Sequence, residues 1–303
     1  MARIQSLNIL TQDGEGKEYL AELYGKVIEG VQKALVSNGI KNQDLSGNPV
    51  SGTVEAKRFC NAAVKAYGTA RTAGAGDAVK ANSVTVSLNQ DKEIVEELEE
   101  KDVTLYGVEG VVQRVAQRQI QQMATHLDTA FFAAAGTAAT EVELDLATAN
   151  VEDICEAVIQ ECESVQNSYV DGVPRDQIVM VMTPKWYGKL RNQLDKCERS
   201  NVDTSVEEFY SWHGVEVKSC IHLPEDDDEN VIPFIVMARG AVAQPVLPKQ
   251  YTAEKVNLSN AIAVELFFSY GTAAVTPDLI FVPVQEEDDT EGGGGTGGQQ
   301  PET

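Results

Sequence analysis

Apolar residues recur at intervals of three and four in two long stretches of the chain, and this spacing predicts two amphipathic helices. In residues 17–36 the apolar stripe consists of Leu20, Leu23, Val27, Val31 and Leu35. In residues 107–135 it consists of Val108, Val111, Val112, Val115, Ile120, Met123, Leu127 and Phe131. At 1.5 Å per residue the second helix is about 40 Å long, so we expect it to be a rod that organises the molecule. The heptad pattern breaks down at Gln119, which weakens a coiled-coil interpretation.

Strand-like alternation appears at residues 53–67 and 83–88, on either side of a Gly-rich segment. This arrangement predicts a long two-stranded hairpin with a flexible tip. Neither strand shows a convincing apolar face, because the charged and polar residues alternate with small residues. An isolated two-stranded hairpin is only marginally stable in water. We therefore expect the hairpin to lie against its own body or against a neighbouring subunit.

The remaining pattern is that of an α+β fold. A helix is predicted at residues 151–165 and a strand at 178–182, followed by a helix with Thr183 as N-cap and Pro184 at its first position. Further strands are predicted at residues 215–217, 231–238, 241–247, 261–269 and 279–284. A polar segment at 38–52 is a predicted connector, and the acidic, Gly-rich residues 285–303 are predicted to be disordered.

The charge balance of the chain argues against some classes of function. The chain of 303 residues has 43% hydrophobic residues, enough for a sizeable core, and its formal net charge is -23. Proteins that grip nucleic acid use clustered Lys and Arg, and no such cluster is present in the sequence. The acidity has a plain interpretation, solubility, and a sharper one: a container wall that does not stick to packaged DNA. The sequence has no apolar run of 18 residues, so we expect no membrane span.

Motifs for chemistry are weak. The five cysteines are an odd number without CxxC spacing, which favours free thiols in a reducing cytoplasm. His213 and His222 flank a short strand with Cys220, but no fourth zinc ligand is suggested. The sequence AGAGD at 73–77 lacks the Lys-Ser/Thr ending of a phosphate loop. We therefore assign no catalytic, cofactor-binding or metal-binding residue.

Two acidic runs, residues 225–229 and 286–289, invite a calcium interpretation. Calcium loops alternate ligands with spacers and need a Gly for the turn, and neither run has this pattern. Solvated loops are the better interpretation. The glutamates within residues 96–100 likewise predict a solvated face, because nothing nearby supplies the dry pocket of a catalytic pair.

The order of these elements resembles the Hong Kong 97-type fold of tailed-bacteriophage major capsid proteins. SGTVEAKRF, leading through the hairpin to DKEIVEELEEKDVTLYGVEGVVQRVAQ, is similar to the extended loop that returns into the spine helix of that family. IVMVMTPKWYGKL and GVEVKSCIHLP resemble its axial domain, and FFSYGTAAVTPDLIFV its closing peripheral strands. The resemblance covers about residues 45–284.

The resemblance implies a division of the chain into six parts. These are an N-terminal arm with a helix (1–50), an extended hairpin loop (51–92), a peripheral domain with the spine helix (93–147), an axial domain (148–238), a return to the peripheral domain (239–284) and a disordered tail (285–303).

The implied function is a coat protein that assembles as pentamers and hexamers into an icosahedral shell around double-stranded DNA. The shell is the virion capsid, assembled in the cytoplasm of a bacterial host, and the DNA is held without sequence-specific contacts. The implied partners are other copies of the chain, neighbouring capsomers and a portal protein. A separate scaffolding protein is also expected, because only about 45 residues precede the hairpin, which leaves little room for a scaffolding segment within the chain. We identify no Lys–Asn pair for covalent cross-linking.

Two groups of residues are candidates for contacts between subunits. Basic hairpin residues are expected to meet acidic patches of the neighbour; these are Arg58, Lys65, Arg71 and Lys80. An acidic loop is expected near the capsomer centre, pointing to solvent or binding divalent ions weakly; it comprises Glu225, Asp226, Asp227, Asp228 and Glu229.

Two other interpretations remain open. An encapsulin-like nanocompartment shell has the same fold but encloses protein cargo. A cytoplasmic enzyme or binding protein is disfavoured by the small number of histidines and by the absence of cofactor motifs from the sequence.

Overall fold

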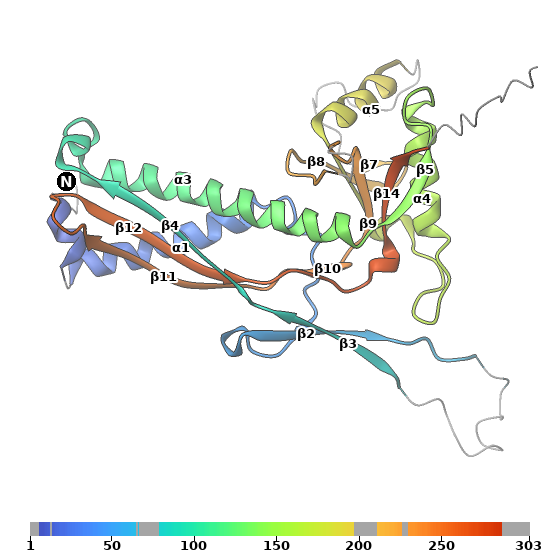
Figure 1. Ribbon diagram of the computed structural model, residues 1–303, viewed down its shortest axis with the longest axis horizontal. Coiled ribbons are helices and arrows are strands. Elements are labelled where there is room, and N and C mark those ends of the chain that lie inside the picture. The colour runs from blue at the N-terminus through green and yellow to red at the C-terminus, as the bar shows by residue number, and fades with distance from the viewer. Residues whose placement is uncertain are drawn as a thin grey trace, which may run out of the picture.

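The computed structural model describes residues 6–12, 14–64, 66, 79–196, 211–225 and 230–286. It shows an elongated α+β molecule with a long helix, α3, along its length (Figure 1). A three-stranded sheet lies beside α3 and a six-stranded sheet lies near its C-terminal end. Among the described residues, no helix combines the length and apolarity that crossing a membrane requires.

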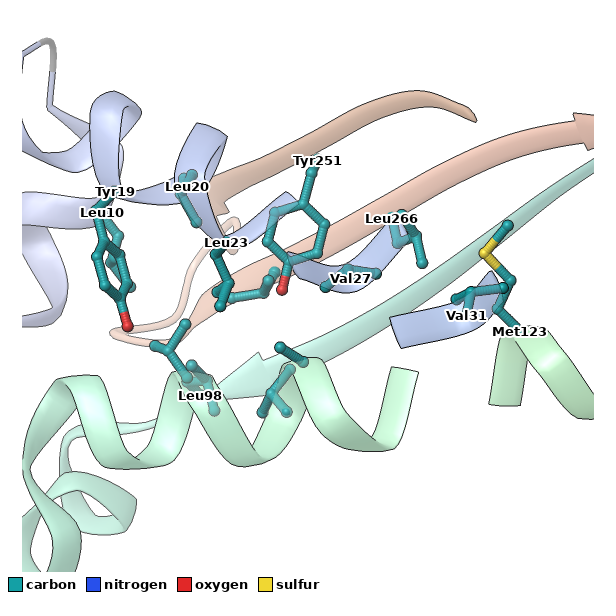
Figure 2. Packing of buried hydrophobic residues seen from close by; sticks show 14 of the residues in the cluster. Leu10, Tyr19, Leu20, Leu23, Val27, Val31, Leu98, Met123, Tyr251 and Leu266 are labelled. Carbon is teal, nitrogen blue, oxygen red and sulfur yellow. The ribbon is translucent and has the colours of Figure 1, made fainter. Parts of the chain in front are cut away.

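The first core lies between helix α1 (Glu15–Ala34), helix α3 (Glu100–Thr137) and the sheet. The predicted stripe of α1 is buried throughout, from Leu20 to Leu35, and Val27 is fully covered. Figure 2 shows the stripe from Leu20 to Val31 between α1, α3 and the strands, in the cluster that also contains Met123 and Leu266. Burial of each large apolar side chain stabilises the fold by about 1.5–3 kcal/mol, so this stripe holds α1 to the body.

Helix α3 confirms the predicted rod. Its stripe residues are buried except Ile120, which is half-buried, and the helix changes direction at Gly107, whose φ of 69° is not helical. The 30 residues after Gly107 span about 45 Å. Gln119, where the heptads fail, is fully buried and donates from Nε2 to the Val264 carbonyl at 3.3 Å. The polar break in the stripe is therefore a contact with the sheet.

The three-stranded sheet has the order β11–β12–β4 and is antiparallel throughout. Its strands are β4 (Gln90–Leu98), β11 (Val246–Lys255) and β12 (Ile262–Tyr270). All nine residues of β4 pair with β12. The sequence predicted β12 but not β4, whose acidic residues we interpreted as a solvated face, nor most of β11.

The second sheet has the order β5–β14–β9–β6–β8–β7. Its strands are β5 (Thr140–Leu144), β6 (Ile178–Met182), β7 (Ser211–Trp212), β8 (Val215–Ser219), β9 (Phe234–Ala238) and β14 (Ile280–Gln285). Helices α4 (Val151–Glu163) and α5 (Pro184–Lys196) contribute to the core on one face. The end of α3 packs on the other face. Because both faces are covered, β6 and β9 are buried at every residue.

Short elements connect these layers. They are η1 (Leu7–Thr11), β1 (Leu45–Ser46), η2 (Pro49–Ser51), η3 (Arg175–Gln177), β10 (Val242–Ala243), β13 (Ala273–Ala274) and η4 (Pro277–Leu279). The predicted tail begins later than residue 285, because Gln285 still belongs to β14 and the Glu286 amide donates to the Leu144 carbonyl at 3.1 Å. The rest of the tail, residues 287–303, lies outside the described residues.

Candidate inter-subunit surface

The predicted hairpin is present, and it leaves the body next to β10 (Figure 1). Strands β2 (Thr53–Phe59) and β3 (Ala81–Ser87) pair antiparallel over seven residues, from Thr53 opposite Ser87 to Phe59 opposite Ala81. Beyond this ladder the Cys60 amide donates to the Lys80 carbonyl at 2.9 Å. The hairpin thus has the strand pairing that the alternation predicted, with a first strand shorter than expected.

One expectation for the hairpin was wrong. Its base has an apolar face, formed by Val54, Ala56 and Val86, and each of these residues is at most 2% exposed. They pack against Ala243 and Val275 of the body. The sequence reading missed this face because the residues are few and small. The base of the hairpin therefore lies against its own subunit.

Further out, the hairpin exposes apolar side chains. The exposed fractions are 58% for Phe59, 85% for Val79 and 102% for Val64. Soluble proteins tolerate scattered apolar residues at their surfaces. Here they lie on a narrow projection with no helix or sheet of the described residues covering them, as Figure 1 shows. Burying them would remove apolar surface from water, a gain of about 25 cal/mol per Å².

The four basic candidates of the hairpin are placed differently. Lys80 is exposed. Arg58 is largely buried, because its guanidinium forms an ion pair with Asp278 of the same chain. Lys65 and Arg71 lie outside the described residues. Contact of these residues with a neighbouring subunit stays a prediction.

The acidic loop is described only at its ends. Glu225 forms a bridge with Val231, and the Ile232 amide donates to the Pro224 carbonyl at 2.9 Å, so the ends of the loop are paired. Pro224 also packs closely on Gly136 at the end of α3. Residues 226–229, which carry most of the charge, lie outside the described residues. The position of this loop at a capsomer centre stays a prediction.

The thiols of Cys155, Cys162 and Cys220 are buried, whereas Cys60 is partly exposed. Burial raises the pKa of Cys155 and of Cys162 to about 12, with nearby glutamates adding to the effect. Burial likewise raises the pKa of Cys220 to about 11. A thiol with such a pKa carries almost no thiolate at neutral pH, so these cysteines are poor nucleophiles.

Two of the three histidines, His126 and His213, contact aromatic rings. Tyr270 and His126 share a hydrogen bond of 2.9 Å, and burial lowers the pKa of His126, with Lys92 adding to the shift. The His213 ring stacks on Trp212. Within the described part of the chain, no group of three or more His, Cys, Asp or Glu residues is arranged to hold a metal ion.

An open groove of about 880 Å³ lies between the end of α1, the start of α5 and strand β8. Lys33, Arg191 and Lys218 line it together with Glu216. Lys218 lies 3.5 Å from Glu216 and donates to the Val36 carbonyl at 3.3 Å. Neither a cysteine nor a histidine is among the described residues that line this groove.

The sequence reading missed three residues that hold the hairpin: Asn167, Tyr169 and Asp278. The Asp278 carboxylate accepts two hydrogen bonds from the Arg58 guanidinium, the Asn167 amide donates to the same carboxylate, and the Tyr169 ring stacks on the guanidinium. No sequence signal connects them with Arg58, because they lie more than 100 residues away in the chain.

No protein-family profile matches the sequence, and no curated protein does. Solved structures do match. A structure from Mycobacterium phage Che8 is 16% identical with a TM-score of 0.58, covering 93% of this chain and 92% of that one. The capsid structure of cyanophage P-SCSP1u is 13% identical with a TM-score of 0.59, covering 82% and 86%. A virus-like particle from Pyrococcus furiosus is 12% identical with a TM-score of 0.55, covering 88% and 100%. The chain has the α+β, Hong Kong 97-type fold.

Proposed function

We propose, from this fold and its exposed hairpin, that the chain is the major capsid subunit of a tailed phage. Copies of it would assemble as pentamers and hexamers into an icosahedral shell around double-stranded DNA. The observation that carries the proposal is the hairpin, with Phe59, Val64 and Val79 exposed on a projection from the body. A second copy of the chain supplies the surface that this projection lacks. The role is structural and needs no catalytic residue.

The charges of the chain fit this proposal. Hairpin residues 57–80 include five Lys and Arg side chains, in a chain with a formal net charge of -23. A basic projection is attracted to the acidic body of another copy, whereas two basic projections side by side repel each other. We propose that Lys65, Arg71 and Lys80 face acidic patches of the neighbour. The acidic loop 225–229 is proposed to lie near the capsomer centre, where repeated copies need solvent or cations between them.

The proposed parts of the chain follow from the same fold. We propose that the chain is divided into the six parts given above: arm, hairpin, peripheral domain, axial domain, peripheral return and tail. We also propose virion localisation, assembly in the host cytoplasm, and separate scaffolding and portal partners.

Electron microscopy of the purified protein tests the proposal. A capsid subunit gives uniform closed particles, whereas a monomeric enzyme or binding protein gives none. The contents of particles isolated from the native source separate two kinds of shell. Double-stranded DNA supports a phage capsid, and a protein cargo supports the encapsulin-like alternative.

Charge reversal of the hairpin tests the contact itself. Arg71→Glu together with Lys80→Glu is expected to abolish closed particles while the subunit still folds, because the two new acids would face the neighbour's acidic surface. The matched control is Lys185→Glu with Lys255→Glu, which changes the net charge equally at two exposed lysines outside the hairpin. Particles from the hairpin variant would refute the contact, and loss of particles from both variants would attribute the effect to net charge.

A further inference from the structure

The Arg58 guanidinium contacts two groups in the body of its own subunit, the Asp278 carboxylate and the Tyr169 ring. Its Nη1 and Nη2 donate to the two carboxylate oxygens of Asp278, at 2.6 and 2.5 Å. The Asn167 side-chain amide donates to the same carboxylate. The Tyr169 ring lies 4.1 Å below the guanidinium carbon. Asp278 belongs to η4, and the other two residues belong to the loop that follows α4.

This contact is partly protected from water. The Arg58 side chain is 14% exposed and the Asp278 side chain 31%. Burial alone would raise the pKa of Asp278, but hydrogen bonds and charge from Arg58, with Asn167, hold it below its usual value. A charge-assisted pair with two parallel hydrogen bonds is stronger and more directional than a single ion pair. The guanidinium therefore fixes both the distance and the angle between β2 and η4.

The pair is the second of two attachments along the hairpin. Val54, Ala56 and Val86 attach the base to the body. Arg58 attaches β2 two residues beyond Ala56, and the Asn61 amide continues the contact by donating to the Ser168 carbonyl at 2.9 Å. One attachment leaves a projection free to pivot, whereas two attachments in line define its direction. The outer attachment is thus the one that controls where the exposed apolar residues point.

We infer that the Arg58–Asp278 ion pair is a positioning contact that sets the direction in which the hairpin leaves the subunit. This inference rests on the proposed function, because that direction matters through the neighbour that the hairpin reaches. In a closed shell the angle between adjacent subunits fixes curvature. The pair therefore links a contact within one subunit to the diameter of the particle. It assigns to Arg58 a role within its own subunit, in place of the contact with a neighbour that the sequence predicted for it.

Hydrogen exchange of the unassembled subunit tests the contact without requiring particles. In Arg58→Ala, the peptide that covers residues 57–63 is expected to exchange about tenfold faster or more, because its outer attachment then retains only the backbone bond from Asn61 to Ser168. Arg58→Lys is expected to accelerate exchange too, since an ammonium cannot make the two parallel bonds. Lys57→Ala is the matched control: it removes the same charge from the preceding, exposed residue. Exchange in α3 reports whether each variant stays folded.

Particle diameter tests the consequence. Arg58→Ala and Asp278→Asn are expected to give a broader distribution of diameters than wild type, and Lys57→Ala the wild-type distribution. Wild-type exchange at 57–63 in both Arg58 variants would overturn the positioning contact. Faster exchange with an unchanged distribution of diameters would overturn its link to curvature. If closed particles of this chain form neither from the purified protein nor in its native source, the proposed function fails, while the exchange result still decides whether the pair positions the hairpin.

Discussion

Asp128, in the last third of α3, joins that helix to the end of α1 through a single side chain. It is 2% exposed, and its carboxylate accepts hydrogen bonds from the Val36 amide at 2.9 Å and the Ser37 amide at 3.1 Å. These amides follow the last turn of α1, where the chain leaves the helix. Burial lowers the pKa of Lys41 and of Lys218, and the charge of Asp128 opposes both shifts. The buried Asp128 carboxylate thus accepts two backbone hydrogen bonds and interacts electrostatically with two lysines.

Replacing Asp128 should destabilise the subunit. Asp128→Ala leaves two backbone donors without their acceptor, and we expect the free energy of unfolding to fall by about 2–3 kcal/mol. Urea unfolding of the unassembled subunit measures the change. Asp176→Ala removes an exposed carboxylate and should change stability by less than about 0.5 kcal/mol. Equal effects of the two substitutions would contradict the role given to Asp128.

At the scale of elements, periodicity predicted those with one clean apolar face. Helices α1 and α4 were expected within two residues of their observed bounds, as were β6 and β12, whereas α3 begins seven residues earlier than expected and only the start of α5 was predicted. Strand β4 was missed because charged residues occupy both of its faces; Glu96 pairs with Arg118 on the side of α3. Strand β11 was missed because Pro248 interrupts it at a register shift. Both strands form through pairing with β12, which no local pattern reports.

The candidate surface was predicted only in part, because sequence patterns report local features and not contacts between distant residues. Alternation and the Gly-rich segment indicated the hairpin, which is a local feature. Its attachment through Asp278 joins residues 220 positions apart, and only the folded chain brings them together. Basic residues of the hairpin were therefore assigned to one kind of contact, although Arg58 has its partner within the subunit.

Two glycines of α1 give opposite predictions for one substitution. At Gly25 an added Cβ would meet no atom within 4 Å, so Gly25→Ala should stabilise the subunit by about 0.5–1 kcal/mol through helix propensity. At Gly16 the added Cβ would lie 1.9 Å from the Ile9 carbonyl oxygen. Gly16→Ala should therefore force η1 away from α1 and destabilise the subunit. Thermal unfolding of both variants checks this, and changes of the same sign would contradict the packing of η1 on α1.

At the scale of the whole molecule, the dominant property is negative charge. The formal net charge of -23 is distributed over a chain in which many cations are already paired, such as Lys26 with Glu22 and Arg239 with Glu216. Affinity for DNA comes mainly from cations that displace counterions at phosphates. A surface of this kind disfavours contact with the phosphates of DNA.

Unassembled subunits should therefore leave duplex DNA unbound. We expect no retardation of a DNA fragment in a gel at about 0.15 M salt, and none at about 0.02 M salt, where phosphate contacts are far stronger. The low-salt lanes are the stringent condition. A retarded band that disappears as salt is added would reveal a basic patch that acts despite the net charge.

Strand β3 ends at Ser87 and β4 begins at Gln90, so the hairpin runs almost without interruption into the sheet beside α3. A pull along the hairpin would act parallel to β4 and load its nine pairs with β12 together, as shear, instead of opening them one at a time. Ladders loaded in shear resist far more force than ladders that are peeled. In a shell under internal pressure, tension from a neighbour would thus pass through the hairpin into the sheet and the long helix behind it.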